Sequence, residues 1–515
     1  MNRKALGISI AAVAILWLGL EVAGRAMSPW ARDRFIDAVE ERFASEVEVA
    51  DLQVRLFPSF RASGSKMIFR HHGRTDVPPL FEIDRFRAES GFWDALRLHV
   101  TQVELEGMHI VVPRGKDHDG DDDDKDGDDK KGKSGAGGFV IERIIADGSV
   151  LDILPKDPGK EPMTFEMKEL ELTGASADEA MAFDAVLTNP KPPGLIDAVG
   201  HFGPWNGEEP RRTPLDGDYT FTDADLSHFN GIAGILSSEG SFEGVLEKIA
   251  VSGWTDTPDF RVDSAGQSVH LKTDYKAVVD GTSGDTYLEP VLASFLNSQV
   301  VARGKVANEP GQKGKSVILD VQVVQGRVED MIAIAVPVEK APLEGDIRFT
   351  TKFRLPPGDP KVVERLELDG HFGIDESTFS DGGWQDKLNE LSQRAKGKPE
   401  EPALGDVASD FSGDFHLRGG VITLSDLHFR TPGARVSLDG DYGLVTKKLD
   451  FQGTLEIDAK VSETVTGVKS FFLKIVDPIF KKKHAEGSSI PIKIGGSVDD
   501  PSFGLALGGG KKSSD

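Results

Sequence analysis

The stretch FSGDFHLRGGVITLSDLHFRTPGARVSLDGDYGLVTKKLDFQGTLEI, residues 411–457, decides the fold class of this chain. Apolar and polar side chains alternate along it, which is typical of β-strands that bury one face. Gly413, Gly440 and Gly453 occupy apolar positions of that alternation. A glycine on the apolar face lets a sheet bend or lets another group approach the backbone closely. The stretch therefore predicts neighbouring strands of a bent sheet.

The same alternation extends from this stretch over most of the chain. It is clear in VEVADLQVRLF (47–57), VELEGMHIVV (103–112), FEMKELEL (165–172) and VILDVQVV (317–324), and strand signals continue to residue 507. The glycine signature, in which a polar and then an apolar residue follow glycine, also recurs at irregular spacing, which argues against a repeat of fixed length. Its other positions are Gly200, Gly217, Gly240, Gly345 and Gly370.

Helical patterns are few and short. The candidates are residues 30–44, 226–237, 288–298, 384–396 and 465–483. They are too few to cover so much sheet, so its apolar face must close on itself, pack as a sandwich or shelter an apolar ligand. The predicted fold class is mainly β, a long antiparallel sheet of about 25 strands with few short helices.

Composition excludes several classes of function. The chain has 515 residues, a net charge of −25 and no cysteine. So acidic a protein is a poor partner for nucleic acid. The absence of cysteine excludes disulfides, thiol nucleophiles and thiolate metal sites.

The N-terminus predicts a membrane anchor. Residues 6–20 carry no charge and follow Arg3 and Lys4. With the apolar residues on either side, this run approaches the roughly 20 residues that span a bilayer. Basic residues before a span favour the cytoplasm, so the rest of the chain is expected to be exported. The alternative is a cleaved signal peptide, since residues 24–26 (Gly-Arg-Ala) faintly resemble a cleavage site.

Residues 116–138 are a low-complexity acidic segment, which predicts a solvated, disordered loop. Residues 127–134 match the letters of a phosphate-binding loop, but aspartates fill the cradle and no helix pattern follows. Asp122, Asp124 and Asp126 match the start of a calcium loop, whose closing carboxylate is replaced by Lys133. Neither match predicts a built site.

No catalytic constellation is apparent. The chain lacks HExxH and GxSxG patterns, and Ser63 to Lys66 fits SxxK only within a strand pattern. We therefore expect no enzyme activity, no metal site and no cofactor.

Residues 411–457 and SSIPIKIGGSVDDPSFGLAL (488–507) together resemble the C-terminal region of the AsmA family. The matching features are a G-x-F start, an L-D-F-x-G-x-L strand and a closing P-x-x-I-x-G followed by P-x-F. VEVADLQVRLFPS (47–59) and TQVELEGMHIVVPR (101–114) are similar to the family's N-terminal part. The middle of the chain is similar only loosely, and the acidic loop departs from the pattern.

This resemblance implies a single-pass protein of the bacterial inner membrane with its bulk in the periplasm. It implies a long, curled β-groove that is open along one side and whose apolar interior carries phospholipid tails between inner and outer membranes. It implies no catalytic residues. The expected order is an anchor (1–26), an N-terminal AsmA-like region (27–115), the acidic loop (116–138), a central groove region (139–400), the AsmA-like C-terminal region (401–507) and a disordered tail (508–515).

The groove-lining candidates are the residues that share the phase of the glycines. They are Phe411, Phe415, Leu417, Val436, Leu438, Tyr442, Leu449, Phe451, Leu455, Ile457, Ile490, Ile492 and Ile494. The alternative is that they pack against one another as a dry core. The helix pattern at 465–483 could touch anionic lipid through Phe471, Phe472, Lys481, Lys482 and Lys483. The alternative there is a helix that caps the sheet, with its lysines at the negative end of the dipole.

We therefore expect a protein that binds phospholipid and supports its transport and outer-membrane biogenesis. Its expected partners are phospholipids, the inner membrane and outer-membrane or envelope proteins, without nucleic acid. The first alternative is an assembly factor that offers strand edges to outer-membrane proteins. The second is an exported enzyme, which would require a convergent polar pocket.

Overall fold

The computed structural model describes residue 36 and, with short gaps, residues 45–112, 140–458 and 488–505. The gaps are residues 56–57, 72–77, 96, 98, 156–158, 160, 176–178, 207–208, 264–266, 313, 337–339, 381–384, 387, 390–391, 394–395, 397–405 and 498–499. Among the residues so described, no helix has the length and apolar character needed to cross a membrane. The predicted anchor, the acidic loop, the 465–483 helix and the C-terminal tail lie outside them.

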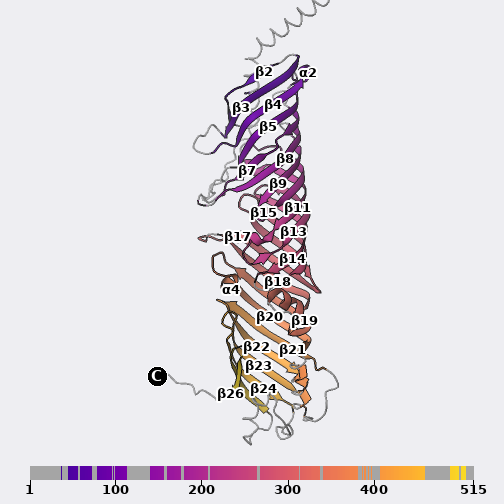
Figure 1. Cartoon of the computed structure of the whole chain (residues 1–515), viewed down its shortest axis with the longest axis vertical. Coiled ribbons are helices and arrows are strands. Elements are labelled where there is room, and N and C mark those ends of the chain that lie inside the picture. The colour runs from indigo at the N-terminus through magenta and orange to yellow at the C-terminus, as the bar shows by residue number, and fades with distance from the viewer. Residues whose placement is uncertain are drawn as a thin grey trace, which may run out of the picture. The chain divides into compact units, whose positions relative to one another are not determined.

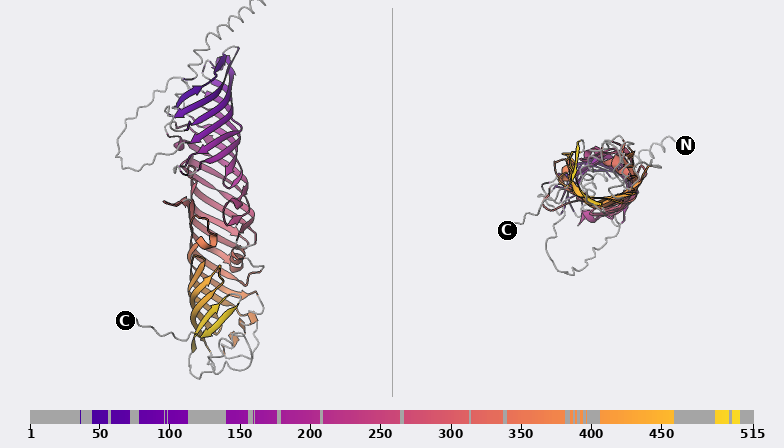
Figure 2. Two further views of the ribbon diagram at one scale, coloured as in Figure 1. Left: turned by 60° about the vertical axis from the view of Figure 1, so that its left-hand side comes forward. Right: turned by 90° about the horizontal axis from the view of Figure 1, so that it is seen from below.

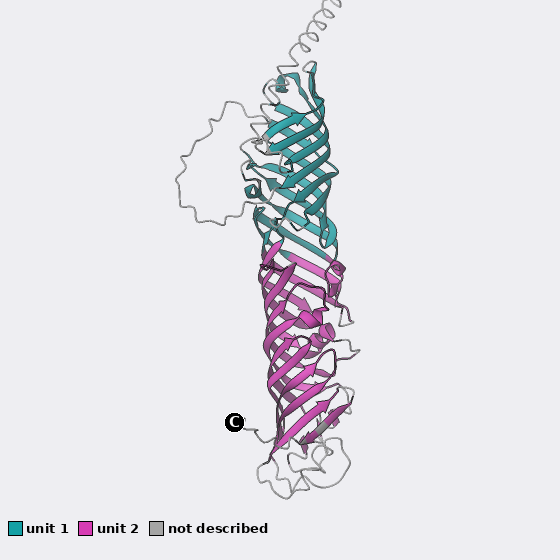
Figure 3. Cartoon of the chain, turned by 90° about the vertical axis from the view of Figure 1, so that its left-hand side faces the viewer, with its two compact units in different colours: residues 1–225, 237–253, 278–284 teal, residues 226–236, 254–277, 285–515 magenta. Residues whose placement is uncertain are grey.

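The described chain is mainly β, as the alternation predicts, with 26 strands in one mixed sheet (Figure 1). It divides into two compact units (Figure 3). Unit 1 comprises Met1–Asp225, Ser237–Gly253 and Val278–Gly284, and unit 2 comprises Leu226–Leu236, Trp254–Ala277 and Asp285–Asp515. The strands β14 (Lys248–Val262) and β15 (Val269–Asp280) contain residues of both units.

Unit 1 is built mainly of long strands that pair with their neighbours in the chain. Its elements are β1 (Ser45–Val49), β2 (Gln53–Arg55), β3 (Ser59–His71), β4 (Phe81–Gly91), α2 (Phe92–Ala95), β5 (His99–Val112), β6 (Val140–Ile145), β7 (Ser149–Ile153), β8 (Met163–Ala175), β9 (Met181–Pro190), β10 (Pro193–Phe202), η1 (Pro210–Arg212), β11 (Pro214–Asp225) and most of β13 (Ile235–Val245). Both β1 and β2 pair with β3, at opposite ends of that strand.

The expectation of a purely antiparallel sheet is wrong at one place in unit 1. Strand β5 pairs in parallel with β6 at one end, where His99 opposes Val140, and with β7 at the other, where His109 opposes Val150. A parallel pair needs a connection long enough to return the chain to the start of the first strand. The segment between Val112 and Val140, which contains the predicted acidic loop, is that connection.

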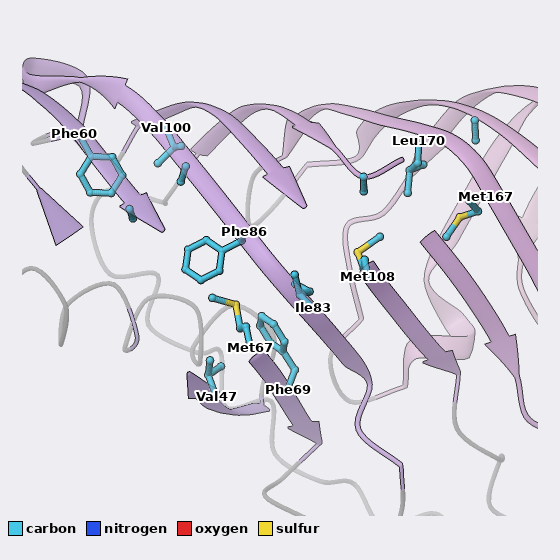
Figure 4. Close-up of a cluster of buried hydrophobic side chains, with 14 residues drawn as sticks. Val47, Phe60, Met67, Phe69, Ile83, Phe86, Val100, Met108, Met167 and Leu170 are labelled. Carbon is cyan, nitrogen blue, oxygen red and sulfur yellow. The ribbon is translucent and has the colours of Figure 1, made fainter. Parts of the chain in front are cut away.

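The core of unit 1 follows the alternation of β3, β4 and β5 (Figure 4). Met67 opposes Ile83, and Ile83 opposes Met108, so the three side chains share one face. All three are buried. Each such burial stabilises the fold by about 1.5–3 kcal/mol, which explains why the apolar phase of these strands specifies their register.

Unit 2 is a regular antiparallel succession in which each strand from β16 to β26 pairs with the next. Its elements are η2 (Leu226–His228), β12 (Ile232–Ala233), β16 (Asp285–Phe295), β17 (Ser298–Asn308), β18 (Lys315–Arg327), α3 (Val328–Ala335), β19 (Leu343–Leu355), α4 (Val362–Arg365), β20 (Glu367–Phe379), β21 (Ser409–Arg418), β22 (Val421–Thr431), β23 (Ala434–Gly443), β24 (Leu449–Ile457), β25 (Ser488–Gly496) and β26 (Pro501–Leu505).

Two of the predicted helices are wrong. Residues 288–298 lie mostly in β16, where a bulge between Leu288 and Val291 shifts the apolar period by one residue and so imitates helical spacing. Residues 226–237 form η2, β12 and the start of β13, interrupted by Gly231 and Gly234 at positive φ. The described residues between 385 and 393 are helical, as predicted.

Candidate binding face

One face of unit 2 is apolar across many neighbouring strands. Residues directly opposite one another in antiparallel strands point to the same side of the sheet. One such row crosses the strands from β16 to β24, and its members are Leu288, Gly304, Leu319, Phe353, Leu368, Leu417, Ile422, Tyr442 and Leu449. The apolar phase is therefore continuous from strand to strand, and we call this side of unit 2 the apolar face.

All the groove-lining candidates lie on the apolar face. Phe411, Val436, Leu455 and Ile490 stand in one row. The others stand in adjacent rows of the same face: Phe415, Phe451 and Ile494 in one, Leu438 and Ile492 in the next, Leu417, Tyr442 and Leu449 in a third, and Ile457 opposite Ala434.

The exposure of these candidates is uneven. Leu417, Phe451, Leu455, Ile490 and Ile492 are buried. The remaining candidates are half-buried, and none is exposed. A sheet face packed as a dry core would bury nearly all its large apolar side chains. This face retains partly accessible apolar surface across β21 to β24.

Aromatic rings on the apolar face contact one another over strands that carry glycine. The rings of Phe349 in β19 and Phe415 in β21 stack with centroids 5.2 Å apart. Gly370 of β20 lies between them, opposite Phe415, and a Cβ there would meet the Phe415 ring at 2.6 Å. Gly370 is therefore required for the rings to meet across its strand.

The glycines of the apolar face lie where the backbones of neighbouring strands approach each other most closely. A Cβ built at Gly370, Gly440 or Gly453 would overlap a carbonyl oxygen of the neighbouring strand. Neighbouring strands approach each other most closely on the concave side of a bent sheet, so the apolar face is the inner side of the bend. Those strands of unit 2 that are coloured orange to yellow follow a curve in the end-on view of Figure 2.

Unit 1 uses the same combination of glycine and aromatic residues. Gly200 of β10 lies directly opposite Gly217 of β11. Phe183 of β9 opposes Gly200 on the other side, and its ring stacks on that of Phe242 in β13 with centroids 6.5 Å apart. A Cβ at Gly217 would meet the Phe242 ring at 3.0 Å. The glycine signature in the sequence thus corresponds to one packing arrangement in both units.

The opposite face of unit 2 is polar and carries cross-strand hydrogen bonds and ion pairs. His371 contacts Asp414 at 2.8 Å, and Lys493 contacts Asp450 at 3.3 Å. Asp439 and Gln452, which alternate with lining candidates, are exposed and oppose each other on this face. Such exposed pairs stabilise the fold by only about 0–1 kcal/mol each, so their main effect is to make this face hydrophilic and solvated.

Helices cover part of the apolar face. Val328, Met331 and Ile332 of α3 pack against Val323 and Ile347 near one end of β18 and β19. Asp330 holds α3 in place, because its buried carboxylate accepts hydrogen bonds from the Asn297 N–H (2.8 Å) and the Ser298 hydroxyl (2.7 Å).

A second helical segment follows β20. Its Leu388 is buried, and the hydroxyl of Ser392 donates to the Pro432 carbonyl at 2.7 Å. This bond ties the segment to the turn between β22 and β23. With α3 and this segment both present, the lining candidates in β21 to β24 other than Leu417, Phe451 and Leu455 remain half-buried.

Residues outside the predicted lining set also belong to the apolar face. Phe349 of β19, Phe372 of β20 and Phe429 of β22 contribute aromatic rings, and Leu424 of β22 contributes an aliphatic side chain. The alternation of apolar and polar residues in IRFTTKFRL (347–355) and VITLSDLHF (421–429) indicates that Phe349, Leu424 and Phe429 lie on this face. Bulges at Ile374/Ser377 and Leu424/Leu427 change its phase within the strands, which obscures it.

A network of charges links the ends of β18, β19 and β20 to Glu309, which follows β17. Arg354 contacts Glu309 at 3.1 Å and Glu367 at 3.3 Å. The Ser316 hydroxyl donates to Glu309 at 2.5 Å. This hydrogen bond, with a smaller contribution from Arg354, holds the pKa of Glu309 below its usual value of 4.5.

The lowered pKa of Glu309 predicts a pH dependence of stability. Its ionised form contributes stability above the usual pKa, and that stability is lost as the pH falls through the lowered folded-state pKa. The urea midpoint of Glu309→Gln should lie below that of the wild type at neutral pH, and the gap should close in acid. Glu289→Gln, on the exposed side of β16, controls for the loss of one surface carboxylate. A gap that is independent of pH would contradict this assignment.

Phe471, Phe472 and Lys481 to Lys483, the expected membrane contacts, lie outside the described residues, as do the residues matching phosphate-binding and calcium loops. No known protein-family model, curated protein sequence or solved structure matches the chain.

Proposed function

We propose that this chain binds the acyl chains of phospholipids along the apolar face and conducts them passively between the two membranes of a bacterial envelope. The observation that carries the proposal is the continuous apolar row from β16 to β24, whose side chains other than Leu417 are only partly buried, beside an opposite face of polar and charged pairs. The AsmA-like motifs in residues 411–457 and 488–507, and the anchor expected at residues 1–26, support an inner-membrane protein of the periplasm.

The energetics favour such a face for lipid. Moving a phospholipid through water exposes its tails at about 0.8 kcal/mol per CH₂, so two long chains meet a barrier of roughly 20 kcal/mol or more. A continuous apolar surface removes most of that barrier. It needs no charge transfer and no bond chemistry, so the function requires no catalytic group.

The test uses the chain without its anchor, residues 27–515, produced in the periplasm. Photo-crosslinking side chains replace Leu438, Phe451 and Ile492 on the apolar face, and Asp439 and Gln452 on the opposite face serve as matched controls. Adducts are identified by mass spectrometry. We expect phospholipid at the three apolar positions and at neither control.

Absence of lipid at every position in a folded protein would mean a dry core. That result would favour the alternative function, an assembly factor that acts through protein contacts. Defects in outer-membrane protein folding without bound lipid would favour that alternative directly.

A further inference from the structure

The most exposed large apolar side chain in the described residues belongs to α2. Trp93 is 71% exposed, far more than the other exposed tryptophan, Trp254, at 42%. Its ring contacts that of the half-buried Phe92 edge-on, with centroids 5.2 Å apart. Phe92 and Trp93 thus form a short aromatic projection, in which the half-buried Phe92 packs against Trp93 and the Trp93 ring lies in solvent.

The fold presents this projection at one end of unit 1. The ladder between β3 and β4 ends where Ser59 opposes Gly91, and α2 begins at the next residue. Figure 1 shows α2 at the same end of unit 1 as β2, the end at which the described chain begins. Helix α2 is therefore positioned to contact a flat surface that lies beyond this end of unit 1.

Three arginines lie on strands or turns at the same end of unit 1 as the projection, in an otherwise acidic chain. Arg55 and Arg61 oppose each other on β2 and β3, and Arg97 follows α2. All three are exposed. Among the described residues, carboxylates nearby include Asp94 within α2 and Glu89, which pairs with Arg61 at 3.5 Å. The local excess of positive charge contrasts with the net charge of −25 for the whole chain.

Tryptophan with flanking arginines is the composition that favours the interface of a lipid bilayer. The indole combines a large apolar area with a polar N–H, and guanidinium groups bind phosphate oxygens. The anchor predicted at residues 1–26 ends about 20 residues before β1. A connection of that length would keep unit 1 near the bilayer that such an anchor crosses.

We propose that α2 docks on the bilayer that holds the anchor, with Trp93 inserted among the lipid headgroups and the three arginines facing phosphates. The proposal rests on the membrane attachment that forms part of the proposed function. Docking would hold the first strands of unit 1 against the membrane surface, so that the end of the sheet meets the lipid rather than turning freely on the linker.

The absence of cysteine makes a direct test possible. Trp93→Cys in the full chain carries a nitroxide label, and the protein is reconstituted in vesicles of phosphatidylethanolamine and phosphatidylglycerol. Trp254→Cys, in β14 and also exposed, is the matched control. We expect dissolved oxygen to relax the label at 93 several-fold more than a water-soluble nickel chelate does, and the reverse at 254. Equal accessibility to the chelate at both positions would overturn the proposal.

A second measurement leaves the native side chain in place. Phospholipid brominated on its acyl chains should quench the wild type more than Trp93→Phe, whereas Trp254→Phe should be quenched like the wild type. Equal quenching of wild type and Trp93→Phe would overturn the proposal. Lipid capture at Leu438, measured on the same vesicles, reports the proposed function separately, so failure of one is distinguishable from failure of the other.

Discussion

Replacing Gly453 with alanine should destabilise unit 2 by about 3 kcal/mol or more. The added Cβ would overlap the carbonyl oxygen of Ser437 and approach the Leu438 Cα at 2.9 Å. Both are backbone atoms of the neighbouring strand, so no side chain can move aside. Relief would require β23 and β24 to separate and would loosen the bend of the apolar face. The expected result is a clear fall in the urea midpoint, followed by tryptophan fluorescence or circular dichroism.

Gly373→Ala is the matched control for this substitution. Gly373 also lies within a strand of unit 2, but the nearest atom to an added Cβ is a guanidinium nitrogen of Arg348 at 3.6 Å. That is an ordinary contact with a flexible side chain, so alanine should leave the midpoint nearly unchanged or raise it slightly. Equal losses at both glycines would mean that strand glycines matter only through flexibility, and that the apolar face is not the concave one.

The period-two pattern predicts which side of a strand each residue takes because that information is local. Leu438 and Ser437 differ by one position and therefore point to opposite faces whatever the partner strand. Antiparallel pairing between chain neighbours then aligns one apolar phase with the next, as in the row from Phe411 to Ile490. The sequence alone therefore predicts that the lining candidates lie on one face of the sheet.

Features that depend on distant contacts could not be predicted in the same way. The parallel pairing of β5 with β6 and β7 depends on where the chain returns after a long connection, which no alternation encodes. Residues 288–298 were expected to be helical, and the bulge in β16 that imitates a helical period is visible only in its pairing with β17.

Helix α3 was missed for a related reason. Its sequence, VEDMIAIA (328–335), carries an apolar run that also suits a strand. The helix is selected by tertiary contacts, which include those of Asp330 with Asn297 in the turn after β16 and with Ser298 at the start of β17. Those partners are more than thirty positions away in the sequence.

A single carboxylate on the apolar face should reduce lipid capture strongly. Leu424 of β22 is half-buried and opposes Phe415 on one side and Gly440 on the other. An aspartate in hydrocarbon surroundings costs about 2.5–3.5 kcal/mol, and each 1.4 kcal/mol changes an equilibrium roughly tenfold. Because the position is only half-buried, part of that cost is relieved by water. We therefore expect Leu424→Asp to lower the lipid captured at Leu438 at least about tenfold per folded molecule.

Val421→Asp separates an effect on the ligand from an effect on the fold. Val421 lies on the same strand but on the opposite face, is 41% exposed and opposes Arg418, which can pair with the new carboxylate. It should capture lipid like the parent protein. If Leu424→Asp keeps its urea midpoint and still captures lipid normally, tails do not lie along β22. If both variants lose capture equally, the loss follows from added charge anywhere on the sheet. Loss at Leu424 alone, with the fold intact, would place the acyl chains against the apolar face.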